Sequence, residues 1–301
     1  MSAYKIYGTN MMVQKITLCI ALFFIAKIEA AELIGFSYNR PLQLYALLES
    51  LQTYVTGLST THIIYRADNQ DFESGYEQVK KDFPSVNFIR QSILHPRSDF
   101  KQHTLSLVYT AKAEYLLFAV DDIIVKDYVD LNLCTDLLEK YDAYAFYLRL
   151  GEHIDYCYAV NSYQGVPPLT KYPDHVRSWD FSDGLHDWNY PQTVDMTVYR
   201  KSDLIAMLTD LHFNTPNIFE GQWAAHRPAL KKKGLCFEAA KIVNLPLNSV
   251  QPDWENRNMR FATAEEFLLL FNQGLKIDIQ PLFRIDNRSA HMEYQPFYIR
   301  R

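Results

Sequence analysis

The sequence predicts an α/β protein with a mainly parallel sheet flanked by helices. Short apolar segments alternate with segments whose apolar residues recur at helical spacing, from residue 33 to residue 120. Polar residues follow directly after several of the apolar segments. The chain of 301 residues is 48% hydrophobic and 22% charged, a globular composition that excludes disordered, collagen-like and low-complexity classes.

The N-terminal half is expected to alternate strands with helices. The apolar run from Leu33 to Tyr38 predicts the first strand, and Pro41 predicts a helix start because the first helical turn does not need its missing N–H. The same alternation continues, with strands expected at 62–65, 86–89 and 115–120 and helices at 72–83 and 101–113. Strands separated by helices imply right-handed crossovers and therefore parallel pairing.

The C-terminal half is less regular. A helix is expected at 128–140 and a strand at 143–148, after which residues 151–192 form a long aromatic-rich loop of the kind that usually has a function. A strand at 194–200, a helix at 203–211 and a helix after Phe219 follow. Thr263 to Glu266 predict a capping box, and Gly274 predicts the end of that helix. Residues 31–127 and 128–301 are expected to be two halves of one domain.

Residues 1–30 contain an uncharged apolar run from Ile16 to Ala26. Its 11 residues are too few to span a bilayer, which needs about twenty. The basic flank at Lys15 and the small residues Ala30 and Ala31 fit a secretory signal peptide, with a membrane-associating or buried segment as alternatives. The expected location is the secretory pathway, the periplasm or a membrane surface, and the cytoplasm if the segment is not a signal.

Charge and cysteine content exclude other classes. The formal net charge of -5 has the wrong sign for a protein that holds nucleic acid by neutralising phosphates. The four cysteines form no C-x-x-C pair, which argues against a zinc site or a disulfide framework. We therefore expect no nucleic-acid partner.

Chemistry is expected beyond the carboxyl ends of the strands, where open parallel sheets bind ligands. The residues there are Ser37, Tyr38, Asn39 and Arg40 after the first strand, Asp68 after the second, and Asp121 and Asp122 after residues 115–120. Two adjacent carboxylates repel unless they are compensated, and a divalent metal bound to a substrate diphosphate is one such compensation. The alternative is that the two aspartates cap a helix or lie in a solvated turn.

Several segments follow one another in a characteristic order. They are FSYNRP (Phe36–Pro41), IIYRAD (Ile63–Asp68), EYLLFAVDDIIV (Glu114–Val125), VDMTVYRKSDL (Val194–Leu204) and NTPNIFEGQWA (Asn214–Ala224). Together they resemble the GT-A glycosyltransferases, in particular the family 2-like group, over most of Leu33 to Arg301. The resemblance implies a GT-A-like fold with a Rossmann-like sheet and an acceptor-side C-terminal half.

For the donor, the resemblance implies that Ser37 to Arg40 receive the nucleotide and that Asp68 contacts the uracil or ribose. Asp122 would coordinate Mn²⁺ or Mg²⁺, and Asp121 would contact the ribose or the metal. The motif Val120-Asp121-Asp122 lacks the first Asp of a full DXD, so the number of metal ligands stays open. Lys101 is a candidate cation near the phosphates, unless it is a solvated helix lysine. His291 would complete the metal shell, as a C-terminal histidine does in some GT-A enzymes, unless it is an ordinary histidine.

For the acceptor, the resemblance to inverting members implies a carboxylate base. Glu220 is the first candidate, followed by Asp195 and Asp187, although a carboxylate in a helix's first turn can also be a simple dipole partner. Trp179, Trp188 and Tyr190 are expected to form a platform for sugar rings, or else to pack a long loop.

These residues predict transfer of a sugar from a nucleoside diphosphate sugar, with UDP as the expected nucleotide, to a hydroxyl of a glycan or another acceptor, assisted by Mn²⁺ or Mg²⁺. Two alternatives stay open. A nucleotidyltransferase also uses paired carboxylates, but it normally has a glycine-rich phosphate loop, and residues 37–41 contain no glycine. A secreted carbohydrate-binding protein could keep the same fold without catalysis.

Overall fold

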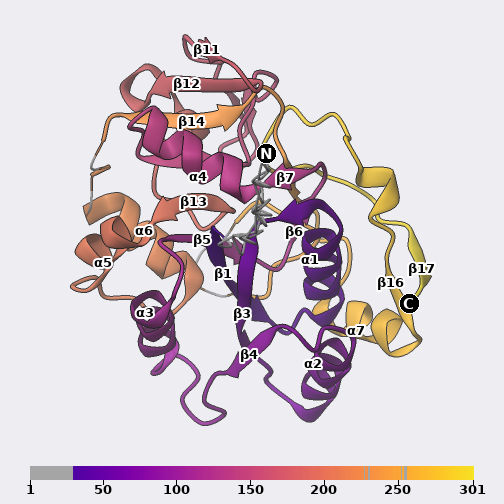
Figure 1. The fold of residues 1–301 in the computed structure, drawn as a ribbon. Helices are drawn as coiled ribbons and strands as arrows, with labels where there is room; N and C mark the ends of the chain where they lie inside the picture. The colour runs from indigo at the N-terminus through magenta and orange to yellow at the C-terminus, as the bar shows by residue number, and fades with distance from the viewer. Residues whose placement is uncertain (1–29, 227, 230, 252, 254–255) are drawn as a thin grey trace, which may run out of the picture.

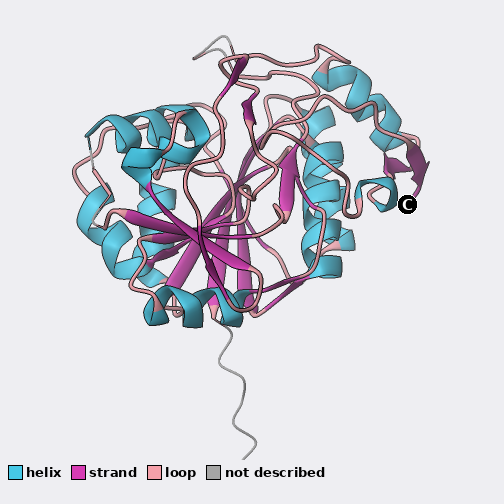
Figure 2. Cartoon of the chain, turned by 90° about the horizontal axis from the view of Figure 1, so that it is seen from above, coloured by secondary structure: helices cyan, strands magenta, loops and turns pink. Residues whose placement is uncertain are grey.

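The computed structural model describes residues 30–301 except 227, 230, 252, 254 and 255. A nine-stranded sheet in the order β11-β12-β14-β8-β13-β5-β1-β3-β4 runs through the molecule, with helices on both faces (Figures 1 and 2). The expected signal peptide lies outside the described residues except for Ala30. Within the described part of the chain, no helix is long and apolar enough to cross a membrane.

The N-terminal elements follow the predicted alternation. They are β1 (Ala31–Tyr38), α1 (Pro41–Tyr54), β2 (Val55–Thr56), β3 (Leu58–Arg66), α2 (Gln70–Asp82), β4 (Asn87–Arg90), α3 (Phe100–Thr110) and β5 (Tyr115–Val120). β1 pairs in parallel with β3 and with β5, and β3 pairs in parallel with β4. The predicted α/β class is confirmed.

The strand order places a crevice at the carboxyl ends of β1 and β5. The chain passes from β1 to β3 and β4 on one side, and then returns to β5 on the other side of β1. Ligands bind where the strand order reverses in this way. Phe36 is level with Val120 in the β1–β5 register, so Ser37 and Asp121 lie side by side just beyond the end of that pairing, while Ser37 still pairs with β3.

The remaining elements complete the sheet and its cover. They are β6 (Ile123–Val125), β7 (Val129–Asp130), α4 (Leu131–Lys140), β8 (Ala145–Tyr147), β9 (Tyr156–Cys157), β10 (Ser162–Tyr163), β11 (Thr170–Tyr172), β12 (Val176–Asp180), η1 (Phe181–Asp183), η2 (His186–Asn189), β13 (Thr197–Arg200), α5 (Lys201–Leu208), α6 (Pro216–His226), β14 (Lys233–Phe237), β15 (Ile242–Asn244), α7 (Ala264–Asn272), β16 (Leu275–Ile277), η3 (Gln280–Leu282) and β17 (Tyr298–Arg300).

The C-terminal half adds antiparallel pairs to the sheet. β13 is antiparallel to both β5 and β8, and β12 is antiparallel to β11 and β14, whereas β8 and β14 are parallel. The prediction that residues 151–192 lack regular structure is wrong for the short elements β9, β10, β11, η1 and η2, and above all for β12. That strand pairs with β14, more than 50 residues further on, so its structure depends on a long-range partner that local sequence does not reveal.

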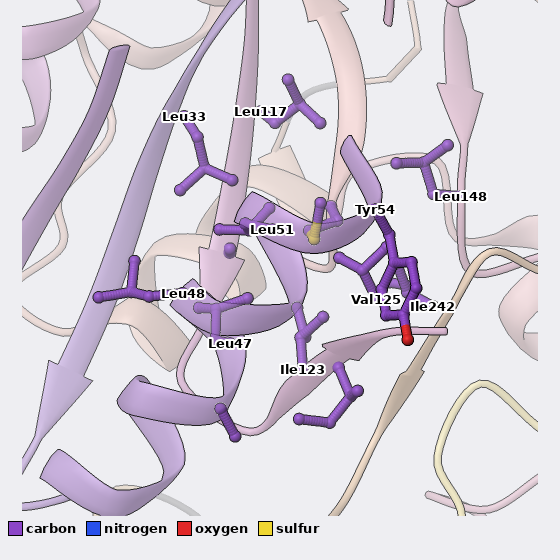
Figure 3. Close-up of a cluster of buried hydrophobic side chains, with 14 of the residues drawn as sticks. Leu33, Leu47, Leu48, Leu51, Tyr54, Leu117, Ile123, Val125, Leu148 and Ile242 are labelled. Atoms are coloured by element: carbon purple, nitrogen blue, oxygen red, sulfur yellow. The ribbon is translucent and has the colours of Figure 1, made fainter. Parts of the chain in front are cut away.

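Alternate residues of the central strands pack on opposite faces of the sheet. On one face, Leu33 and Leu117 lie in a buried cluster with Leu47 and Leu51 of α1 (Figure 3). On the other face, the cluster contains Phe36 and Phe118 together with residues of α3, α5 and α6. Each face is therefore closed by its own helices, and the strand ends stay rigidly placed. Both clusters draw on residues 31–127 and 128–301.

Candidate active site

A cavity of about 590 Å³ opens beyond the carboxyl ends of β1 and β5. It brings together residues from Phe36 to His291, which are 255 positions apart in the sequence. The predicted site residues that line it are Ser37, Tyr38, Arg40, Asp121, Asp122, Asp187, Tyr190, Asp195, Glu220 and His291. Donor-side and acceptor-side candidates thus share one cavity.

Asp121 holds the turn that follows β1. Its Oδ1 accepts a hydrogen bond from Arg40 Nη1 at 2.9 Å. Its Oδ2 accepts one from Ser37 Oγ at 2.8 Å and one from the Tyr38 backbone N–H at 3.3 Å. Both carboxylate oxygens are therefore occupied, which leaves Asp121 as a positioning group rather than a free ligand.

Asp122 is the member of the pair with free ligand capacity. Its Oδ2 lies 3.6 Å from Arg40 Nη1, whereas its Oδ1 is buried and has no hydrogen-bond partner in the structure. Burial raises the pKa of Asp122 to about 6, opposed chiefly by the charge of Arg40. A buried, unpartnered carboxylate oxygen fits an inner-sphere contact to Mg²⁺ or Mn²⁺, which typically use one or two carboxylates plus substrate phosphates.

The described residues hold no cluster of three or more His, Cys, Asp or Glu side chains placed to bind a metal by themselves. His291 lines the cavity, and its ring stacks on Tyr158 with ring centroids 6.2 Å apart. The described residues therefore supply only part of the coordination shell of a metal ion. Such a site fits a cation whose remaining ligands come from a bound substrate.

Tyr38 is braced at the mouth of the cavity. Its hydroxyl donates to Asp68, and the guanidinium carbon of Arg66 lies 4.3 Å from the centre of its ring. Asp68 also accepts from Arg66 Nε at 2.8 Å and from Asn39 Nδ2 at 3.2 Å. Asp68 thus fixes Tyr38, and Asn39 holds Asp68, but neither Asn39 nor Asp68 is among the residues that line the cavity.

Three further predicted residues, Lys101, Trp179 and Trp188, also lie outside the cavity lining. Lys101 is in the first turn of α3 with its ammonium 5.9 Å from the centre of the Phe213 ring, and it is not among the cavity-lining residues. Trp179 and Trp188 are buried, and their indole N–H groups donate to the backbone oxygens of Trp188 and Ile154, each at 2.8 Å. The expected platform is corrected accordingly: the two tryptophans pack the loop, and Tyr190 alone of the three lines the cavity.

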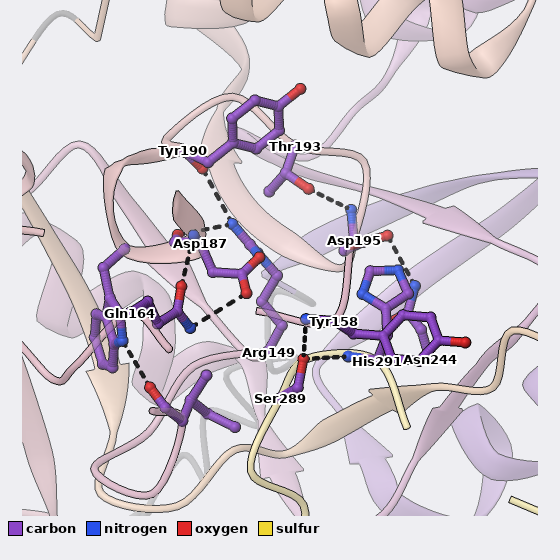
Figure 4. Close-up of polar contacts among 12 residues, drawn as sticks. Arg149, Tyr158, Gln164, Asp187, Tyr190, Thr193, Asp195, Asn244, Ser289 and His291 are labelled. Carbon is purple, nitrogen blue, oxygen red and sulfur yellow. Dashed lines mark hydrogen bonds and ion pairs between the residues drawn. The ribbon is translucent and has the colours of Figure 1, made fainter. Parts of the chain in front are cut away.

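Asp187 belongs to a buried charge pair. Arg149, only 1% exposed, donates to Asp187 Oδ1 at 2.7 Å and to the Tyr190 backbone oxygen at 3.1 Å (Figure 4). Gln164 Nε2 lies 3.3 Å from the other carboxylate oxygen. Because both oxygens of Asp187 are engaged and its charge is compensated, it is the weakest of the three base candidates.

Asp195 lies just before β13 rather than inside it, since the strand begins at Thr197 and not at the predicted Val194. Asn244 Nδ2 donates to its Oδ1 at 3.0 Å (Figure 4). The next residue, Met196, has a φ of 41°. A non-glycine residue in this region is strained, and such strain concentrates at functional sites.

Glu220 lies on α6 and accepts a hydrogen bond from the Val194 backbone N–H at 2.9 Å. Burial, and then the nearby charge of Asp195, raise its pKa to about 7. α6 begins at Pro216, earlier than predicted, and Thr215 caps it by accepting a hydrogen bond from the Ile218 backbone N–H at 3.3 Å. Glu220 therefore lies beyond the first turn of α6. The alternative that Glu220 is a first-turn carboxylate stabilised by the helix dipole is therefore wrong.

The raised pKa predicts an effect on stability. Folding makes Glu220 hold its proton more tightly, so the folded state loses stability as pH rises from about 4.5 to about 7. Glu220→Gln should therefore raise the melting temperature at pH 8 and change it much less at pH 5. Thermal unfolding of both proteins at the two pH values measures this, and an equal shift at both would show that the carboxylate is not destabilised by burial.

Sequence reasoning missed Arg149 and Asn244, although each directly contacts a predicted carboxylate. Arg149 comes two residues after β8, so the rule that led to Asp121 also applies to it. Arg149 directly follows the predicted strand at 143–148, so its position at a strand end is the signal that identifies it. Asn244 ends β15, a short strand that was not predicted.

Comparison with known proteins places the chain near glycosyltransferases. No family model matches it. The chain is 28% identical over 229 residues to the bifunctional glycosyltransferase pgtA of Dictyostelium discoideum, a match that covers 67% of this chain and 28% of that protein. The predicted resemblance to glycosyltransferases is confirmed by this relative.

Two solved structures show low similarity to the chain. S. aureus TarS 1-349 in complex with UDP is 14% identical, with a TM-score of 0.42 over 69% of this chain and 60% of that one. The mannosyltransferase PcManGT from Pyrobaculum calidifontis, in complex with GDP-Man and Mn²⁺, is 11% identical, with a TM-score of 0.37 over 62% of this chain and 50% of that one.

Proposed function

We propose that this protein is a glycosyltransferase that moves a sugar from a nucleoside diphosphate sugar, with UDP as the nucleotide, to a hydroxyl group of a glycan or another acceptor. One observation carries the proposal. A single cavity at the strand-order reversal has Asp122 and Arg40 on its donor side and Glu220, with a near-neutral pKa, on its acceptor side. The glycosyltransferase relative supports it.

The donor side provides recognition of a nucleoside and a diphosphate. Tyr38 presents an aromatic face, held by Asp68, on which a nucleobase can stack. Asp122 Oδ1 would hold Mn²⁺ or Mg²⁺, which neutralises charge on the departing diphosphate. Arg40, paired with Asp121, and Arg97, paired with Asp253 at 2.7 Å, place two guanidinium groups in the same cavity, where they can donate hydrogen bonds to phosphate oxygens.

The acceptor side provides a base. Glu220 takes the proton of the acceptor hydroxyl while that oxygen forms a bond to the anomeric carbon of the sugar. The bond between the anomeric carbon and the diphosphate oxygen breaks, and the leaving diphosphate takes the electron pair. A base with a pKa near 7 is well matched to physiological pH. This single displacement inverts the anomeric configuration.

A thermal-shift experiment tests the proposal. UDP should raise the melting temperature when Mn²⁺ is present and much less in EDTA, because a ligand that binds only the folded state stabilises it. GDP, CMP and nucleoside triphosphates are measured in parallel. An unchanged melting curve with every nucleotide would refute the proposal, and stabilisation by triphosphates alone would favour a nucleotidyltransferase.

A further inference from the structure

Arg40 occupies an unusual place for a cation in this cavity. It is 9% exposed and lies in the turn between β1 and α1. One end of its guanidinium faces Asp121 and Asp122, and Nη2 donates to the backbone oxygen of Asn248. Its Nε is buried and has no hydrogen-bond partner in the structure. The side chain is thus fixed from two sides, directly beside the acidic pair.

Among the described residues, Arg40 is the ion-pair partner of both Asp121 and Asp122. Nη1 is 2.9 Å from Asp121 Oδ1 and 3.6 Å from Asp122 Oδ2. The side chain of Asp121 is 5% exposed and that of Asp122 is 18% exposed, so water screens their mutual repulsion poorly. A buried charge without compensation is costly, so the guanidinium stabilises the pair in the absence of any ligand.

The same charge opposes a free divalent cation. With formal charges, Arg40 and the two aspartates together carry one net negative charge. A divalent cation bound to Asp122 alone would make the group positive in a poorly hydrated place, next to a guanidinium that Asp121 and Asn248 hold in position. A nucleoside diphosphate sugar carries one negative charge on each phosphate, so it enters together with the cation without adding net charge.

We propose that Arg40 is the resident counter-ion of the acidic pair, and that it makes the site bind the divalent metal together with the nucleoside diphosphate and bind the free metal poorly. This inference rests on the proposed function. It assigns Arg40 a role in coupling two ligands, and such coupling is reciprocal: the nucleotide strengthens metal binding by the same factor as the metal strengthens nucleotide binding.

The experiment measures Mn²⁺ binding directly. Titrations of the full-length wild-type protein, followed by electron paramagnetic resonance of free Mn²⁺, are made with and without saturating UDP, or whichever diphosphate the thermal-shift screen identifies. We expect UDP to strengthen Mn²⁺ binding about tenfold or more, within the usual range of coupling between sites. Calorimetric titration of UDP with and without Mn²⁺ should give the same factor.

Two variants separate charge from shape. Arg40→Gln removes the positive charge and should bind free Mn²⁺ about tenfold more tightly than wild type. Its coupling factor should be smaller than that of wild type, because only the direct contact between metal and diphosphate then couples the two ligands. Arg40→Lys keeps the charge but not the planar fork, so its affinity for free Mn²⁺ should stay at the wild-type level. Circular dichroism checks that each variant is folded.

Several results would overturn the inference. If Arg40→Gln binds free Mn²⁺ no more tightly than wild type does, Arg40 is not the counter-ion. The same conclusion follows if Arg40→Lys and Arg40→Gln bind free Mn²⁺ equally tightly. If Arg40→Gln does not fold, the wild-type protein decides, because Mn²⁺ affinity independent of UDP contradicts the coupling. A wild-type protein that binds neither Mn²⁺ nor any nucleotide refutes the proposed function itself. That result differs from the ones above, in which ligands bind but Arg40 does not control the metal.

Discussion

Glu220→Gln should lower sugar transfer about a hundredfold or more, because a positioned general base typically contributes 10²–10⁴ to the rate. Glutamine keeps the size of the side chain and can still accept from the Val194 N–H, but it cannot take a proton. Donor binding should survive, since Glu220 lies on the acceptor side. The measurement is the steady-state transfer rate, together with the melting-temperature shift that the nucleotide induces.

Glu265→Gln is the matched control, because Glu265 is exposed in the first turn of α7 and does not line the cavity. It should transfer at the wild-type rate. Normal transfer by Glu220→Gln would instead move the base to Asp195, or after it to Asp187. A Glu220→Gln protein that also loses nucleotide binding would assign Glu220 to the donor pocket or the fold.

Asp122→Asn should reduce turnover about a hundredfold or more while the fold persists. The change keeps the shape of the side chain but removes the charge that a metal ligand needs, and metal stabilisation of a leaving diphosphate is worth several kcal/mol. The melting temperature without ligand should not fall below that of wild type at neutral pH, because Asp122 Oδ1 makes no hydrogen bond in the structure and burial raises the pKa of Asp122 to about 6. Transfer rates and Mn²⁺-dependent nucleotide binding measure the effect.

Asp142→Asn is the control for this charge change. The Asp142 side chain is 84% exposed, and its φ of 49° lies in a region that asparagine also accepts. It should leave transfer unchanged. If Asp122→Asn retains near-normal activity, the acidic dipeptide is a structural turn, as the sequence alone also allowed.

The donor side could be predicted because it depends on local patterns. Each strand from β1 to β5 is a short apolar run, and parallel pairing brings the residues after the runs to one edge of the sheet. That reasoning assigned Ser37 and Asp121, 84 positions apart in the sequence, to the same edge of the sheet, and in the structure the two side chains are hydrogen-bonded. The capping box at Thr263 and Glu266 is equally local, and it too is confirmed.

The acceptor side depends on contacts that no local pattern encodes. Whether Trp188 forms a platform or packs a loop is decided by the Ile154 backbone oxygen that receives its N–H, and by Trp179, whose ring centre is 4.9 Å away. The pairing of Arg149 with Asp187 joins residues 38 positions apart across an irregular segment. The composition of such a segment is the same whether its aromatic and charged residues face a ligand or pack against each other.

A crystal structure of the protein soaked with UDP and Mn²⁺ tests the central claim most directly. Anomalous scattering locates the manganese, and the electron density locates the nucleotide. We predict manganese against Asp122 Oδ1, bridged to the diphosphate, with the uracil at Tyr38 and Arg40 close to the phosphates. Nucleotide bound outside this cavity, or a nucleotide and a manganese ion that do not contact each other, would contradict the account.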